Sequence, residues 1–220
     1  MNYEHRKSTV RLTLLDPSGQ PLKNQDLDIK QTKHEFLCGF GAFDAVERSR
    51  EGITQEEQQF LDDRLNKMLA IFNYGTLPFY WGRFEPEEGH PQTEVTKKGA
   101  EWLQARGVKT KGHPLCWHTV CAPWLMKYDN QTILQKQLAR ITRDVTDFKG
   151  LIDSWDVINE VVIMPVFDKY DNAVTRLAKE LGRVGIVKAV FEEARAANPG
   201  ATLLLNDFDM SARYEQLIED

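Results

Sequence analysis

The sequence lacks a long apolar run and an excess of positive charge. No stretch approaches the roughly 18 to 20 consecutive apolar residues that a membrane span needs, and residues 1–6 lack the apolar core of a signal peptide. Lysine and arginine number 28 against 33 acidic residues, and the two signs are interspersed along the chain. We therefore expect neither a membrane nor a nucleic acid as a partner, and the localisation stays unassigned.

Cysteine is also scarce, which argues against a disulfide framework or a thiolate metal site. The three cysteines, Cys38, Cys116 and Cys121, are an odd number without the spacing of metal ligands. Cys38 and Cys116 lie within apolar runs, where a thiol usually acts as a small hydrophobic side chain. We expect free, buried thiols, and neither a metal nor a cofactor.

The composition that is present, 41% hydrophobic and 28% charged, is typical of a globular protein with a sizeable core. In its first part, apolar residues alternate over residues 10–14, a turn signal follows at residues 16–19, and apolar positions return at residues 27–29. This pattern predicts a small antiparallel β-strand module over residues 1–35.

From residue 36 onward, short apolar runs alternate with helical patterns. Thr54 followed by Glu57 has the spacing of a capping box, which predicts a helix start with Phe60, Leu65 and Met68 in its buried stripe. Further helices are expected over residues 93–106, 134–148, 186–197 and 214–218, and strands over residues 36–43, 71–77, 108–117, 152–159 and 202–208.

Two parallel α/β architectures fit this alternation, the doubly wound open sheet and the (β/α)8 TIM barrel. No glycine-rich phosphate loop follows the first strand, which weakens the nucleotide-binding version. Polar and aromatic residues gather after several strands, where barrel enzymes carry their chemistry: Trp81, His113, Trp117, His118, Asn159, Glu160, Asn206 and Asp207.

Glu160 is the principal candidate for chemistry. It comes immediately after a buried strand, where limited solvation would raise the pKa of its carboxyl toward that of a proton donor. A strand-end glutamate that faces solvent fits the spacing equally well.

His113 and His118 offer a second candidate feature, but they are five residues apart without further ligands, which disfavours a metal. Tryptophans beside such a site suit sugars, whose C–H faces stack on aromatic rings. Trp102 and Trp155 fit the core instead.

Three segments resemble signatures of glycoside hydrolase family 10, the endo-1,4-β-xylanase family, in the right order. Residues 112–118 are similar to its G-H-T-L-V-W-H, residues 155–160 to its W-D-V-V-N-E, and residues 204–208 to its Y-I-N-D-Y. Residues 72–89 and 123–125 resemble its second-strand region and the loop after its third strand.

The resemblance implies that residues 36–220 form the N-terminal portion of the family's catalytic barrel, about the first five β/α units of a TIM barrel. It implies a retaining hydrolase of β-1,4-linked xylan or a related plant cell-wall β-glycan, with Glu160 as acid/base. The substrate-binding residues carried over are His113, Trp117, Asn159, Asn206, Trp81 and Tyr80. The family resembled is commonly secreted.

Two departures from the family pattern matter. Anchored on Trp81, the family's Glu-Asn pair and Lys, which grip sugars, fall on Thr76, Leu77 and Tyr80, which predicts tolerance of sugars other than unsubstituted xylose. The nucleophilic glutamate is expected beyond Asp220, so we expect the isolated chain to be inactive. The alternative is a catalytically incomplete fragment that acts as a carbohydrate-binding or structural remnant.

Overall fold

The structure is a computed structural model that describes residue 4 and residues 7–208, and its contacts divide the chain into two units, Met1–Phe36 and Leu37–Asp220. In the first unit, one isolated antiparallel bridge joins Leu15 and Pro21 around a turn in which the Asp16 carboxylate accepts hydrogen bonds from the Ser18 and Gln20 N–H groups. No strand is assigned in the described residues of this unit, so the expected β-strand module is reduced to its turn. An alternating segment needs a layer that covers its apolar face.

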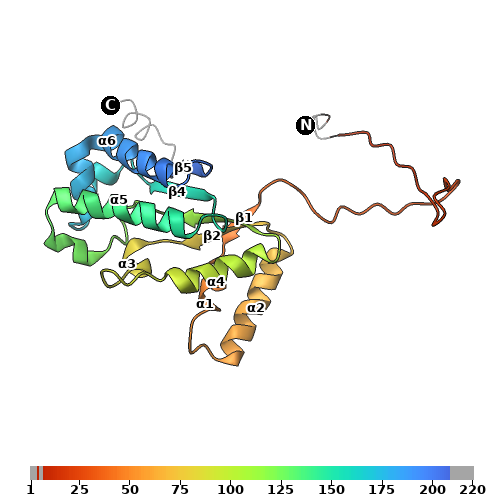
Figure 1. Ribbon diagram of the computed structural model, residues 1–220, viewed down its shortest axis with the longest axis horizontal. Helices are drawn as coiled ribbons and strands as arrows, with labels where there is room; N and C mark the ends of the chain where they lie inside the picture. The colour runs from red at the N-terminus through yellow and green to blue at the C-terminus, as the bar shows by residue number, and fades with distance from the viewer. Residues whose placement is uncertain (1–3, 5–6, 209–220) are drawn as a thin grey trace. The chain divides into compact units, whose positions relative to one another are not determined.

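The second unit contains five parallel strands in one sheet: β1 (Gly39–Gly41), β2 (Tyr74–Pro78), β3 (Lys109–His113), β4 (Ser154–Asn159) and β5 (Thr202–Asn206). Their order in the sheet follows their order in the chain (Figure 1). A doubly wound sheet reverses direction at a switch point, whereas a barrel adds each strand to the same side of the one before. The strand order therefore matches the barrel type, and the described residues supply five of the strands of such a barrel.

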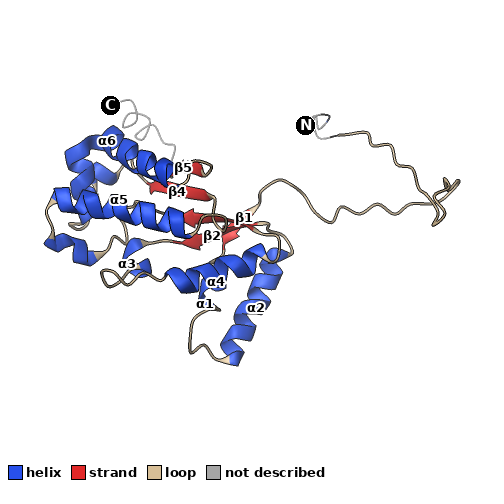
Figure 2. Ribbon diagram, in the orientation of Figure 1, coloured by secondary structure: helices blue, strands red, loops and turns tan. Residues whose placement is uncertain are grey.

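Helices connect these strands and lie beside the sheet (Figure 2). Helical segments lie between successive strands, and the long helix α6 (Ala173–Ala197) contains a break at Gly182. The helical elements are α1 (Phe43–Glu47), α2 (Gln55–Leu69), α3 (Trp81–Phe84), α4 (Thr93–Gln104), η2 (Pro123–Lys127), α5 (Asn130–Asp147), η3 (Met164–Val166) and α6 (Ala173–Ala197). The helix expected over residues 214–218 lies outside the described residues.

Helix α2 begins as the sequence predicts but is less buried than expected. The Thr54 side chain accepts from the Glu57 N–H at 3.2 Å, and the Glu57 carboxylate accepts from the Thr54 N–H at 3.0 Å. Leu65 is 1% exposed, but Phe60 and Met68 are 60% and 42% exposed. The expected buried stripe is therefore wrong at those two positions, because the pattern marks an apolar face without showing that another element covers it.

The core between the sheet and its helices is centred on Trp155 of β4. This fully buried ring lies edge-on to Phe79 and Phe148, with centroids 4.9 and 6.3 Å away. It packs so closely on β3 that a Cβ at Gly112 would lie 2.2 Å from the ring. The glycine therefore sets the distance between the strands that carry His113 and Glu160.

Two expectations drawn from composition concerned the cysteines and membrane-spanning segments. Cys38, Cys116 and Cys121 are free; Cys116 is buried, whereas Cys38 and Cys121 are partly exposed. Among the helices formed by the described residues, none combines the length and apolar character needed to cross a membrane.

Candidate active site

The carboxyl ends of β2, β3, β4 and β5 bring most of the candidate residues together. Parallel strands present their ends at one edge of the sheet, so residues far apart in the sequence meet there. Tyr80 follows β2, His113 ends β3, and Glu160 follows β4 next to Asn206 at the end of β5.

Glu160 sits at a sharp corner of the backbone. Its φ of +54° is in the left-handed region, which side chains other than glycine adopt at a cost of roughly 1 kcal/mol or more. Its N–H donates to the carbonyl of Asn206 at 2.8 Å, and this bond to the neighbouring strand holds the corner. The chain thus turns the carboxylate out of the sheet at the strand end.

The surroundings of Glu160 favour a proton donor. Its side chain is 22% exposed, and burial raises the pKa of its carboxyl, with the negative charge of Asp207 acting in the same direction. The Trp117 indole N–H, which donates to Glu160 Oε2 at 2.9 Å, and the charge of His113 lower that pKa in part. The balance keeps the pKa above its usual range, so the carboxyl holds its proton to higher pH.

His118 lies beneath this carboxylate. Its Nε2 is 3.9 Å from Glu160 Oε2, the residue is 1% exposed, and its ring packs on Phe167 with centroids 4.4 Å apart. Burial lowers the pKa of His118 to about 4. The ring is therefore neutral near pH 7 and acts as a dipole against Glu160 instead of as a counter-charge.

His113 is fixed by Asp156, a residue of β4 that is 1% exposed. His113 Nδ1 lies 2.7 Å from Asp156 Oδ2, and Lys111 Nζ lies 2.8 Å from the same oxygen. A ring nitrogen bound to a carboxylate leaves Nε2 to meet a ligand. Asp156 thus orients His113, while Lys111 balances the negative charge of Asp156.

An aromatic cluster stands beside these polar groups. The Tyr80 ring centroid lies 5.6 Å from those of both His113 and Trp117, and the ring of Phe43, the first residue of α1, lies 6.0 Å from Tyr80. Burial raises the pKa of the Tyr80 hydroxyl, so it is a neutral donor and acceptor. Flat rings next to hydrogen-bonding groups suit the two faces of a sugar.

Asn159 and Asn206 lie side by side at the ends of β4 and β5, with their amide groups 2.7 Å apart. With the Asn159 nitrogen turned to the Asn206 carbonyl at 3.1 Å, its oxygen accepts from the Trp117 indole at 3.3 Å. Asn159 is 3% exposed. These contacts tie the amides to the indole that also holds Glu160.

Trp81, for which the resemblance implies a role in substrate binding, packs in the core beside Trp124. It is 4% exposed, its indole N–H donates to Glu85 Oε2 at 3.1 Å, and its ring packs edge-on to Trp124. Leu77 is fully buried as well. Of the residues that the sequence singled out near the end of β2, therefore, only Tyr80 contacts the aromatic cluster.

A buried arginine supports the strand ends from behind. Arg140 of α5 is 3% exposed, donates to the carbonyl of Leu115 at 2.5 Å and to that of Phe79, and pairs with Asp144 at 3.1 Å. These carbonyls belong to the loops after β2 and β3. The arginine thus fixes the segments that carry Tyr80 and Trp117.

Asp156 and Arg140 were absent from the residues that the sequence picked out, and His118 was considered there only at a strand end and as half of a disfavoured metal pair. Asp156 lies within the recognised segment 155–160, and a carboxylate in an otherwise apolar strand was a usable signal. Arg140 gave none, because its role depends on the packing of α5 on the sheet.

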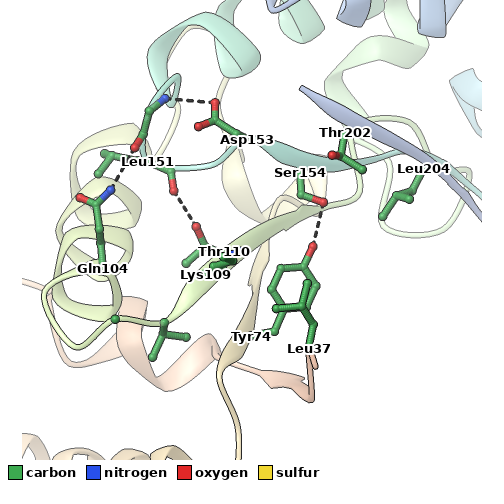
Figure 3. Close-up of a pocket in the computed structure, with 13 residues that line it drawn as sticks. Leu37, Tyr74, Gln104, Lys109, Thr110, Leu151, Asp153, Ser154, Thr202 and Leu204 are labelled. Carbon is green, nitrogen blue, oxygen red and sulfur yellow. Dashed lines mark hydrogen bonds between the residues drawn. The ribbon is translucent and has the colours of Figure 1, made fainter. Parts of the chain in front are cut away.

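Figure 3 shows a cavity of about 740 Å³ at the opposite, amino-terminal ends of the strands. Tyr74, Lys109, Ser154 and Thr202 line it, and the Tyr74 hydroxyl donates to Ser154 Oγ at 2.7 Å. Its lining lacks the perturbed acid and the histidines found at the other end. We therefore place the candidate site at the carboxyl ends in spite of this cavity's size.

Within residue 4 and residues 7–208, no three histidine, cysteine or acidic side chains are grouped so as to hold a metal ion.

Similarity to known proteins extends over most of the chain. The family model described as Glycosyl hydrolase family 10 matches residues 38–218. An endo-1,4-β-xylanase 2 of Arabidopsis thaliana is 26% identical over 96% of the chain and 18% of its own length, and the anti-sigma-I factor RsgI6 of Acetivibrio thermocellus is 27% identical over 93% and 24%.

Solved structures extend the likeness to the fold. A psychrophilic family 10 endo-β-1,4-xylanase superposes with a TM-score of 0.58 at 25% identity, covering 71% of this chain and 52% of its own. Xylanase 10B from Thermotoga petrophila, in complex with xylobiose, gives 0.64 at 23% identity over 82% and 53%. The chain thus spans about half the length of these barrels.

Proposed function

The chain belongs to glycosyl hydrolase family 10, and we propose that its strand ends form the acid/base half of the active site of a retaining β-glycan hydrolase. The observation that carries this proposal is Glu160: a partly buried carboxyl with a raised pKa, turned out of the sheet at the end of β4 and held by Trp117. A general acid needs a raised pKa together with a fixed position, and the upward shift of the Glu160 pKa and its hydrogen bond from Trp117 support this role.

In the proposed reaction, Glu160 first gives its proton to the oxygen of the leaving sugar and then takes a proton from water. The partner of Glu160 is a nucleophilic carboxylate about 5 to 5.5 Å away, on which the glycosyl-enzyme forms. We propose that this carboxylate comes from a segment after residue 220. Three other residues have supporting roles in this proposal: Trp117 holds the Glu160 carboxyl in place, and His113 and Asn159 bind sugar hydroxyls.

The proposed substrate is β-1,4-linked xylan or a related plant cell-wall β-glycan. Support comes from relatives named endo-1,4-β-xylanase and from a structural neighbour in complex with xylobiose. The rings of Tyr80 and Trp117 beside His113 add the mixed apolar and polar surface on which sugars bind.

Carbohydrate binding without hydrolysis is the second candidate. It is favoured by the end of β2, where Leu77 is buried and Tyr80 stands in place of a polar grip on the sugar. An experiment can distinguish hydrolysis from binding alone, because only hydrolysis needs a proton donor.

The test uses a longer protein that also carries the proposed nucleophilic segment after residue 220, called the parent protein, with Glu160→Gln. Cleavage of unactivated oligosaccharides should fall about 10²-fold or more, whereas glycosides with activated aryl leaving groups should be much less affected because they need little protonation. Glu192→Gln, on the exposed face of α6, is the matched control and should leave both rates unchanged. Equal losses on the two substrate types would contradict the acid/base role. Unimpaired oligosaccharide binding with no cleavage by the unmodified parent protein would favour the second candidate.

A further inference from the structure

Side chains from two other parts of the fold bind the backbone two residues after Glu160. The N–H of Val162 donates to Asp207 Oδ2 at 3.2 Å, and its carbonyl accepts from Arg183 Nε at 2.8 Å. Val162 is 5% exposed, so water offers little replacement for either bond. Both backbone polar groups of Val162 are therefore bound by side chains.

Asp207, which follows β5, uses both of its carboxylate oxygens to accept from the backbone. Oδ2 accepts from Val162, and Oδ1 accepts from the N–H of Phe208 at 2.8 Å. The preceding residue, Asn206, accepts from the Glu160 N–H at 2.8 Å through its carbonyl. The end of β5 thus binds the loop after β4 at two points, one on each side of the Glu160 side chain. A carboxylate engaged in this way suits support of the acid instead of attack on a sugar.

Arg183, the second side chain on Val162, directly follows the break in α6. Gly182 has a φ of +69°, in the left-handed region that glycine adopts without a steric cost. A guanidinium that donates to a carbonyl makes a charge-assisted hydrogen bond, which is stronger than a bond between neutral groups. The break in α6 therefore coincides with a second contact that fixes the loop after Glu160.

We propose that Asp207 and Arg183 are positioning residues, which fix the left-handed corner at Glu160 so that its carboxyl meets the Trp117 indole. A residue other than glycine keeps a positive φ only where the surrounding structure imposes it. The hydrogen bonds to Val162 and to the Glu160 N–H supply such contacts from β5 and α6. The proposal rests on the proposed function for the acid role of Glu160, whereas the contacts at the corner are a property of the chain itself.

Asp207 also acts on Glu160 through its charge, which raises the pKa of the Glu160 carboxyl. Substitution separates this effect from the hydrogen bond to Val162. Asp207→Asn keeps an oxygen that accepts from the N–H and removes the charge, whereas Asp207→Ala removes both. Trp117 and His113, which lower the pKa of the same carboxyl, stay in place in both variants.

The test is NMR spectroscopy of the 220-residue chain, after circular dichroism has shown that each variant is folded. Asp207→Ala and Arg183→Met each remove one hydrogen bond from the loop. In both, the Val162 amide should exchange with solvent about tenfold faster. The Trp117 indole N–H resonance should also move, because the carboxylate that accepts from it is no longer fixed.

Two further variants complete the comparison. Asp207→Asn should keep amide exchange and the indole resonance near their original values, while the pKa of Glu160, followed by its carboxyl-carbon resonance, should fall. Lys188→Gln, on an exposed part of α6, is the control for Arg183→Met and should change none of the three measurements.

The outcomes separate the positioning role from the proposed function. Unchanged exchange and an unmoved indole resonance in folded Asp207→Ala and Arg183→Met would overturn the positioning role and leave the proposed function intact; if one variant is unfolded, the other decides alone. Equal loosening in Asp207→Asn and Asp207→Ala would show that the acceptor oxygen does not fix the corner. Failure of the Glu160→Gln test in the parent protein would instead overturn the proposed function, whatever the NMR result.

Discussion

At residue 160, burial, an indole and a neighbouring carboxylate together shift the pKa of the Glu160 carboxyl upward. The Trp117 N–H stabilises the ionised form of Glu160 and lowers the carboxyl pKa, against burial and Asp207, which raise it. The indole therefore limits how far the pKa rises while it fixes the direction of the carboxylate.

Trp117→Phe tests this balance at the residue scale. Loss of the N–H donor should raise the pKa of Glu160 further, because burial then acts with less opposition. A carboxyl-carbon NMR titration of the 220-residue chain gives the value, and in a complete enzyme the basic limb of the pH profile should move to higher pH. Trp124→Phe is the matched control, because that indole donates to the carbonyl of Glu85. An unchanged or lowered pKa in Trp117→Phe would contradict the assignment.

His118 gives a prediction for stability against pH. Burial holds its pKa at about 4 in the folded chain, below the ordinary 6.5, so between those values the unfolded state binds more protons. The free energy of unfolding should therefore fall as pH drops from about 6.5 to 4, with a share of that slope owed to His118. Urea unfolding of His118→Gln should show a shallower slope than the unmodified chain, whereas the exposed His90→Gln should not. Identical slopes for the unmodified chain and His118→Gln would refute the buried neutral ring.

Among the elements, β3 and β4 meet at the closest approach in the core, where Gly112 faces Trp155. A methyl group there would lie 2.2 Å from the ring, and neither strand can move aside within a packed sheet. We expect Gly112→Ala to lower the free energy of unfolding by about 3 kcal/mol, measured in urea. Gly41→Ala, where the nearest atom is 3.9 Å away, should change it by about 0.5 kcal/mol or less. Comparable stability of the two variants would mean that Trp155 yields more easily than the packing indicates.

Helix α2 depends more on its own ends than on packing, since most of its residues are exposed. Thr54→Ala removes one half of the capping box and should cost about 1 kcal/mol, whereas Thr54→Ser keeps the oxygen and should cost little. Amide hydrogen exchange across the first turn of α2 measures the effect locally. Equal protection in the two variants would show that contacts with α1, not the cap, hold the helix start.

At the scale of the whole molecule, β1 and β5 each pair with only one neighbouring strand in the described part of the chain. Unpaired edges and partly uncovered residues such as Leu205, which is 48% exposed, favour pairing with other chains. We expect the isolated 220 residues to show no glycosidase activity and to self-associate, as measured by light scattering. Leu205→Lys should reduce the association by placing a charge on the edge strand. A monomer with a sharp thermal transition and xylan turnover would contradict both expectations.

Much of the architecture followed from local patterns along the chain. The capping box at Thr54, the alternation of strands and helices, and the ordered signatures around His113 and Glu160 rest on neighbours in sequence, so the sequence predicted them. The same patterns overstated burial at Phe60 and Met68, because periodicity shows which side of a helix is apolar and not whether anything packs on it. The boundaries of β1 and β3 were also shorter than the apolar runs that predicted them.

By itself, the sequence determined the order of the elements, the family likeness and Glu160 as the residue to examine, because each depends on residue types at fixed spacing. Residue patterns alone left the barrel and the open sheet both possible; the family resemblance implied the barrel, and the tertiary structure supplied the strand order that agrees with it. It also turned Trp81 into the core toward Glu85 and brought Arg83 to 6.0 Å from the Tyr80 ring. Such outcomes depend on which distant groups are brought within a few ångströms, and charge, burial and pKa are properties of that neighbourhood.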